Sequence, residues 1–166
     1  MGGGMAHQVI GTAFNDHTPC LVVCASLVEK ITNQAALCRT CEVLGVNRLV
    51  LPEPDDSWEF RKVAVSAQRW QSVEYCAPDQ LRQWLWQQQT YTRVALALGV
   101  ASQPLVNYDF AAKTLLVLGR ELTGIPADIE ALCDVVLAIP QYGRVESLNV
   151  QTAGAIAIYE YNRQWR

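Results

Sequence analysis

Ser147 and Asn149 place two short polar side chains on either side of Leu148, at the entrance to a helix rich in Ala, Gly and Ile. An oxygen of Ser or Asn accepts hydrogen bonds from the free N–H groups of a first helical turn, so either residue can cap the helix. A single cap needs only one of them, which leaves a second polar group available for other work. No G-x-S-x-G pattern surrounds Ser147, so the spacing does not favour a hydrolase nucleophile.

A second segment, residues 116–126, leads from an apolar run into a helix opened by proline and carries Gly119, Arg120 and Glu121. Gly119 has no Cβ, so a ligand can approach the backbone closely at this position. Two glycines stand at the spacing of a phosphate-binding loop, but Ile and Pro replace its Lys and its Ser or Thr, which excludes that kind of nucleotide site. The alternative is an ordinary loop with a solvated Glu121.

A third segment begins at Asn33, which can cap the helix that follows it. Arg39 lies six residues further on, inside that helix. On spacing alone, the alternative to a functional role is an exposed arginine that forms a salt bridge. The polar residues of all three segments therefore need elements that bring them together.

Short apolar runs alternate with helical patterns along the chain. The runs predict strands at residues 21–25, 48–51, 72–76, 93–98, 115–118 and 135–139. Helices are predicted at residues 35–44, 55–67, 78–88 and 126–133, and from about residue 147 towards the C-terminus. This alternation predicts an α/β fold with a mainly parallel sheet and helices on both faces. Ligands of such sheets bind beyond the carboxyl ends of strands, which here are Ser26, Gly99, Gly119 and Pro140.

The composition is that of a globular protein, because 51% of the 166 residues are hydrophobic. No apolar run approaches the length of a membrane span, and we see no signal-peptide pattern. We expect a loose arm over residues 1–19 and a single domain over residues 20–166. The formal net charge of −3 argues against a stand-alone nucleic-acid-binding module, which normally has a basic surface.

Six cysteines lie among apolar residues, which favours reduced thiols that pack as small hydrophobic groups. Cys38 and Cys41 form a C-x-x-C pair, but no second pair supplies the four ligands of a structural zinc site. His7 and His17 lie far upstream of this pair. We therefore predict no metal site.

Together, the three segments resemble the three motifs of the SPOUT methyltransferases, and among these the TrmH subfamily of RNA ribose 2′-O-methyltransferases. Motif one, N-x-G-x-x-x-R-T, is matched by Asn33, Arg39 and Thr40, with Ala35 in place of its Gly. The matches to motifs two and three are Leu118, Gly119, Glu121, Gly124, Ile125, Ile139, Pro140, Gly143 and residues 147–150. The resemblance runs from about residue 21 to residue 165, and it is strongest with the eukaryotic branch, in which this domain ends a much longer chain.

The resemblance implies a deep trefoil knot at the C-terminal end of the sheet and S-adenosyl-L-methionine as cofactor. In the family, three loops of the knot hold this cofactor, largely through backbone groups. The cofactor-binding positions that the resemblance implies in this chain are Leu98, Gly119, Arg120, Ile139 and Leu148.

The implied reaction is transfer of the cofactor's methyl group to a ribose 2′-OH. Arg39 matches the central catalytic residue of the family. Because a guanidinium stays protonated in proteins, we interpret its role as holding an RNA phosphate and stabilising negative charge on the ribose oxygen. Asn33 and Glu121 would orient Arg39 and its surroundings. Ser147 and Asn149 would complete the pocket between cofactor and ribose.

The resemblance also implies RNA as substrate, most specifically a guanosine in the D-loop of a tRNA, and a homodimer with the target pocket at its interface. The residues of the last helix that suit this interface are Gly154, Ala155, Ala157, Tyr159, Tyr161 and Trp165. The alternatives are an rRNA 2′-O-methyltransferase and a non-catalytic RNA-binding or dimerising domain, the second suggested by Ala35 and the acidic balance. We expect an intracellular protein, cytoplasmic or nuclear, whose natural chain carries further N-terminal domains.

Overall fold

The computed structural model describes residues 18–166, so His7, His17 and most of the predicted arm lie outside the described residues. The described chain forms a seven-stranded sheet in which all neighbouring strands are parallel. Across the sheet, the strands are β3 (Val73–Tyr75), β2 (Arg48–Leu51), β1 (Cys20–Cys24), β6 (Lys113–Leu118), β4 (Thr92–Leu96), β7 (Val135–Ala138) and β5 (Gln103–Pro104). The helices are α1 (Ile31–Val43), α2 (Trp58–Ala64), α3 (Leu81–Gln87), α4 (Ala127–Glu130) and α5 (Val150–Trp165), with 3₁₀ helices η1 (Ala67–Arg69) and η2 (Leu105–Asn107).

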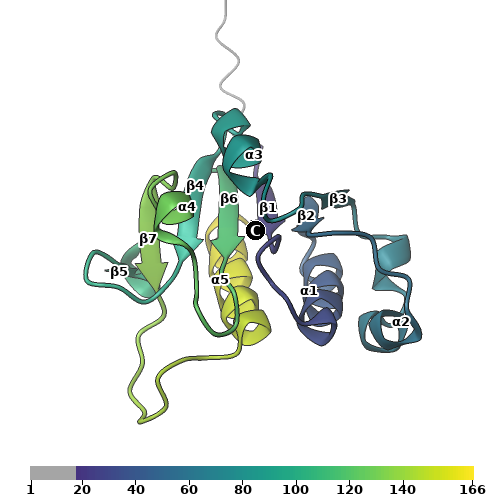
Figure 1. Cartoon of the computed structure of the whole chain (residues 1–166). Coiled ribbons are helices and arrows are strands. Elements are labelled where there is room, and N and C mark those ends of the chain that lie inside the picture. Colours follow the sequence, from purple (N-terminus) through teal and green to yellow (C-terminus); the bar gives the residue numbers. More distant parts are fainter. Residues whose placement is uncertain (1–17) are drawn as a thin grey trace, which may run out of the picture.

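Helices cover both faces of the sheet, which confirms the predicted architecture (Figure 1). Leu21 and Val23 of β1 belong to the core that α1, α2 and α5 cover, whereas Val22 and Cys24 belong to the core beneath α3 and α4. Both sets of side chains are buried, and this is why the strands are unbroken apolar runs in the sequence. Because the strands are parallel, their carboxyl ends meet at one edge, the lower edge in Figure 1.

Some boundaries differ from the prediction because local contacts decide them. The sequence does not predict β5, since two exposed residues carry no apolar pattern. The helix predicted at residues 55–67 is shorter: the Ser57 hydroxyl accepts a hydrogen bond from the N–H of Phe60, and α2 ends at Val65 in the left-handed conformation (φ 51°). β4 ends at Leu96, so Leu98 lies in the loop that follows.

α5 packs against its own domain through residues that we predicted for a dimer interface. A Cβ added to Gly154 would lie 3.0 Å from Cδ2 of Leu37, so glycine permits the close approach of α5 to α1. Ala157 and Tyr161 are buried, and the Tyr161 hydroxyl donates a hydrogen bond to the carbonyl of Ala112 at 2.6 Å. The interface role predicted for these three residues of α5 is therefore wrong.

Trp165 also bonds within the domain, through its indole N–H to the carbonyl of Phe110 at 3.0 Å. Of the predicted interface residues, Ala155 and Tyr159 are left facing outward, and Tyr159 is 64% exposed. The homodimer and the trefoil knot stay predictions.

The cysteines are free thiols, and Cys38 and Cys41 are buried inside α1. Burial raises the pKa of Cys38 to about 11 and also raises that of Cys41, so neither thiol is reactive near neutral pH. Within residues 18–166, no group of three or more His, Cys, Asp or Glu side chains is arranged to hold a metal ion. In the same range, no helix is both long and apolar enough to cross a membrane.

Candidate active site

The loop after β6 folds back on itself directly at Gly119. A Cβ added there would lie 2.5 Å from the carbonyl carbon of Gly124 and 2.8 Å from the nitrogen of Ile125, so the close approach requires glycine. Arg120 and Gly124 exchange two backbone hydrogen bonds, at 2.9 and 3.1 Å, and Gly124 has a left-handed φ of +70°. This tight fold directs Glu121 towards the start of α1.

The Glu121 carboxylate accepts three hydrogen bonds from the beginning of α1. The donors are the backbone N–H groups of Glu29 and Lys30, at 3.1 and 3.0 Å, and the side-chain amide of Asn33 at 2.8 Å. Burial alone would raise the pKa of Glu121, but these hydrogen bonds outweigh it and lower the pKa. A carboxylate at a helix N-terminus also stabilises the helix dipole.

This contact corrects the predicted start of the first helix. α1 begins at Ile31 and has Lys30 as its N-cap residue, so Asn33 lies within the first turn and does not cap it. Glu121 supplies from another part of the chain the acceptor that Asn33 was expected to supply.

Asn33 links Glu121 to the start of α5. Its Oδ1 accepts a hydrogen bond from Nδ2 of Asn149 at 3.1 Å, while its own amide donates to Glu121. Asn149 Oδ1 in turn accepts from the N–H groups of Gln151 and Thr152, at 2.9 and 3.3 Å, and so caps α5. One polar residue from each of the three sequence segments therefore belongs to a single hydrogen-bonded chain.

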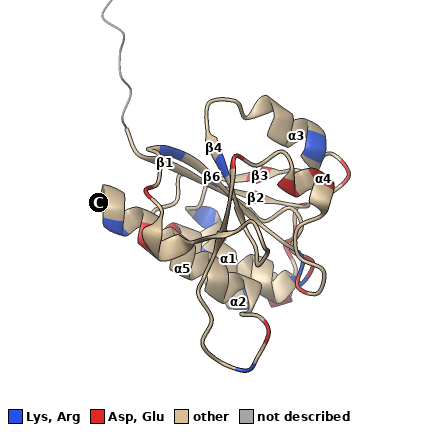
Figure 2. Cartoon of the chain, turned by 90° about the vertical axis from the view of Figure 1, so that its left-hand side faces the viewer, with Lys and Arg blue, Asp and Glu red and all other residues tan. Residues whose placement is uncertain are grey.

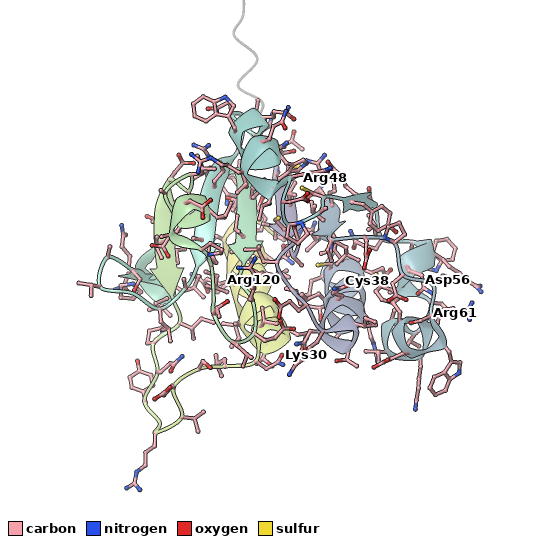
Figure 3. All side chains as sticks on the ribbon, viewed as in Figure 1. Lys30, Cys38, Arg48, Asp56, Arg61 and Arg120 are labelled. Atoms are coloured by element: carbon pink, nitrogen blue, oxygen red, sulfur yellow. The ribbon has the colours of Figure 1, made fainter. Side chains whose placement is uncertain are left out.

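A pocket of about 490 Å³ opens at the carboxyl ends of β4, β6 and β7. Its lining contains the residues predicted to bind the cofactor, Leu98, Gly119, Arg120, Ile139 and Leu148, together with Glu121, Ser147 and Asn149. Figure 3 shows Arg120 and Lys30, two charged residues of the lining, at this edge of the sheet. Arg120 also forms an ion pair with Glu29, with 3.4 Å between Nε and Oε1.

The pocket has the size and character of a small-molecule site. Apolar side chains from the ends of the three strands line it, and these are Leu96, Leu118 and Leu137. Polar and backbone groups of the loops complete the lining, as in most cofactor sites, whose volumes range from about 300 to 1,000 Å³. The residues present therefore fit a bound cofactor of moderate size.

Arg39 does not line this pocket. It lies on the exposed side of α1 and forms no hydrogen bond or ion pair with another residue of the described chain. Asn33 and Glu121 bond to each other and not to Arg39, so the structure shows no direct contact by which they would orient Arg39, and that role stays a prediction.

Ser26, one of the suspected strand ends, is 1% exposed and donates to the carbonyl of Cys76 at 2.5 Å, so its role is structural. Ala35 is fully buried in the interior of α1, where alanine is the best helix former.

Lys30 and Glu130 also line the pocket, and the sequence did not predict either of them. Neither stands in a motif, and a single surface charge in a loop or a short helix gives no signal in one sequence. In Figure 2, the positions of Lys and Arg (blue) and of Asp and Glu (red) are scattered along the ribbon over several helices and loops.

Residues 20–159 match the SpoU rRNA Methylase family. The chain is 41% identical over 148 residues to the Mus musculus tRNA (guanosine(18)-2′-O)-methyltransferase TARBP1, covering 87% of this chain and 9% of that protein. It is 36% identical over 149 residues to the tRNA (guanosine(18)-2′-O)-methyltransferase of Saccharomyces cerevisiae, covering 87% of this chain and 10% of that protein. Its fold matches an AdoMet-bound rRNA methyltransferase from Sinorhizobium meliloti with a TM-score of 0.77, at 22% identity over 90% of this chain and 57% of that one.

The chain therefore belongs to the SpoU rRNA Methylase family, which confirms the family resemblance of its three motifs. It spans about a tenth of the length of the mouse and yeast relatives.

Proposed function

We propose that this chain is the methyl-transferring domain of an S-adenosyl-L-methionine-dependent tRNA guanosine 2′-O-methyltransferase that acts on guanosine 18 of the D-loop. The pocket at the ends of β4, β6 and β7 carries the proposal, because all the positions assigned to cofactor binding line it. The mouse and yeast relatives bear the name of this activity, which supports tRNA over rRNA as substrate. Such a substrate is found in the cytoplasm and nucleus, where we place the enzyme.

The residues of the pocket divide between two tasks. The backbone near Gly119, Ile139 and Leu148 would hold S-adenosyl-L-methionine, which supplies an activated methyl group when bound. Ser147 and Asn149 would face the ribose, because both line the pocket beside Leu148. These residues would align the 2′-OH and exclude water, which is most of what an in-line transfer requires.

Arg39 would bind the RNA. Its guanidinium has no partner in the described chain and stays protonated, so it is free to hold a phosphate and to stabilise negative charge on the ribose oxygen. Arg39 would not act as a base, because a guanidinium keeps its proton in proteins.

We also propose that the domain works as a homodimer. The outer side of α5 and η2 forms an apolar groove of about 420 Å³, and its lining includes Val106, Ile156 and Tyr159. Val106 and Tyr159 are each 64% exposed, so a second copy would bury a substantial apolar area. In such a dimer, Arg39 of one subunit would reach the pocket of the other subunit, although it does not line the pocket of its own chain.

The test uses the complete natural protein with any further domains. Isothermal titration calorimetry should detect binding of S-adenosyl-L-methionine, and mass spectrometry should detect 2′-O-methylguanosine in tRNA after incubation. The absence of cofactor binding would refute the proposal. Methylation of rRNA alone would show that rRNA, and not tRNA, is the substrate.

Arg39→Ala should lower methyl transfer by about 100-fold or more, since it removes a charge that acts in the transition state. The affinity for S-adenosyl-L-methionine should stay within about twofold, because Arg39 does not line the pocket. Arg69→Ala, which removes an exposed arginine of η1, is the matched control and should leave activity unchanged. Equal activity of the Arg39 and Arg69 variants would refute the role of Arg39.

A further inference from the structure

A second side-chain bridge joins α5 to α1, and none of the three motifs contains both of its ends. Nε2 of Gln151 donates a hydrogen bond to Oγ1 of Thr40 at 3.1 Å, although the two residues are 111 positions apart in the chain. The backbone N–H of Gln151 is also bound, by Oδ1 of Asn149 at 2.9 Å. Gln151 is thus fixed at its backbone and at the end of its side chain.

The two bridges hold the same side of α1. Asn33 and Thr40 are seven residues apart, which places them on one face of the helix two turns from each other. Asn149 bonds to Asn33, and Gln151 bonds to Thr40. The start of α5 is therefore hydrogen-bonded to this face of α1 at two points.

Arg39 directly precedes Thr40 on α1. Because its side chain has no partner in the described chain, its direction depends on the backbone of the turn from which it projects. The hydroxyl of Thr40 is where that turn is attached to α5. The same end of α5 continues backwards into Ser147 and Leu148 of the pocket.

We propose that Gln151 is a positioning residue for methyl transfer. Through Thr40, it fixes the turn that carries Arg39 relative to the loop that carries Ser147. This inference rests on the proposed function of the site. Gln151 itself does not line the pocket, whereas its neighbours on α5, Val150 and Ala153, do. Its loss should therefore affect the rate at saturating substrate and not the affinity for the cofactor.

The test compares Gln151→Ala with Asn162→Ala in the complete protein. Asn162 lies on the same helix and donates to the carbonyl of Leu44 at the end of α1, at 2.7 Å, so it is a matched bridge far from the pocket. Gln151→Ala should lower kcat by about three- to tenfold, the range that one net side-chain hydrogen bond can contribute. KM for tRNA and Kd for S-adenosyl-L-methionine should stay within about twofold. Asn162→Ala should leave kcat unchanged.

Two variants of Thr40 separate positioning from general damage. Thr40→Ser keeps the acceptor hydroxyl and should retain the wild-type kcat, whereas Thr40→Val removes it and should match Gln151→Ala. The double variant Gln151→Ala/Thr40→Val should lose no more activity than either single variant, because both substitutions remove the same hydrogen bond. Equal kcat in Gln151→Ala and Asn162→Ala, additive losses in the double variant, or a weaker cofactor affinity would overturn the inference.

Amide hydrogen exchange tests the positioning role of Gln151 without depending on methyl transfer. If the wild-type protein transfers no methyl group, the proposed function fails, but the bridge can still be examined. Gln151→Ala should then speed amide exchange around Arg39 and Thr40, while Asn162→Ala should not. Unchanged exchange there would overturn the inference on its own.

Discussion

The carboxyl edge of the sheet is closed in one half and open in the other. At β1, β2 and β3, hydrogen bonds run from one element to the next. Ser26 donates to the carbonyl of Cys76, and the N–H of Ala25 donates to the carbonyl of Val50 at 2.8 Å. At β4, β6 and β7, the same edge opens into the pocket of about 490 Å³.

The two halves differ in the loops that follow their strands. In the closed half, the segment after β1 is bonded to the segment after β3, through Ser26 and Cys76. In the open half, two loops turn back on themselves: Ser102 donates to the carbonyl of Gly99 at 2.7 Å, and Arg120 and Gly124 bond to each other. Glu121 of the second loop bonds to the start of α1, and the pocket lies at this part of the carboxyl edge, where parallel sheets bind their ligands.

Gly119→Ala should have the largest effect, because the loop after β6 folds back on itself at this residue. The new methyl group would meet backbone atoms of Gly124 and Ile125 at 2.5 and 2.8 Å, and backbone atoms cannot move aside as a flexible side chain can. We expect a loss of about 3 kcal/mol in the free energy of unfolding. Binding of S-adenosyl-L-methionine, measured by calorimetry, should be lost as well.

Gly99→Ala is the matched control for this variant. Gly99 lies in the loop after β4, and a Cβ added there would meet no atom within 4 Å. Its stability should change by no more than about 0.5 kcal/mol in chemical denaturation. Similar losses in both variants would show that the close approach at Gly119 does not shape the open half.

Ser26→Ala tests the closed half and should have an intermediate effect. It removes the donor that satisfies the carbonyl of Cys76 in a buried position, which should cost about 1–2 kcal/mol in chemical denaturation. The affinity for S-adenosyl-L-methionine should not change, because Ser26 lies outside the pocket lining. A loss of affinity would mean that the two halves are coupled.

The sheet and its helices could be predicted because burial on both faces leaves a direct trace in the sequence. The strand at Arg48–Leu51 was predicted to the residue, since prolines follow it and its side chains are all apolar after Arg48. Boundaries set by distant contacts could not be predicted. α1 begins four residues before the expected position, and a carboxylate from Glu121 is bound at that end.

Part of the pocket lining could be predicted from the sequence, but its hydrogen bonds could not. Eight of the residues selected by the motif resemblance line the pocket, whereas Arg39 and Asn33 do not, and the roles of all ten stay predictions. The hydrogen bond from Gln151 to Thr40 could not be predicted, because 111 positions separate the two residues and neither type is unusual. The separation of Arg39 from the pocket could not be predicted either, since it depends on which side of α1 faces solvent.

Glu121→Gln should have the smallest effect, and it probes the link between the two halves. Glu121 lies in the loop after β6, in the open half. Its carboxylate binds the start of α1, the helix that follows β1 of the closed half. Its pKa is lowered in the folded protein, so its contribution is present above the unfolded value of about 4.3 and is lost as the pH falls through the lower folded value. The variant should be about 1 kcal/mol less stable than the wild type at pH 7, because partial exposure screens these hydrogen bonds.

That difference between wild type and Glu121→Gln should be constant above about pH 5 and shrink as the medium becomes more acidic. Urea denaturation of both proteins between pH 3 and pH 7, at the same ionic strength, measures it as a function of pH. Asn33→Ala removes one of the three hydrogen bonds to the carboxylate, so it should reduce the same acid-dependent difference without abolishing it. A difference between wild type and Glu121→Gln that stays constant through the acid range would mean that Glu121 acts through packing and not through its charge. The contact between the loop after β6 and α1 would then depend on packing alone.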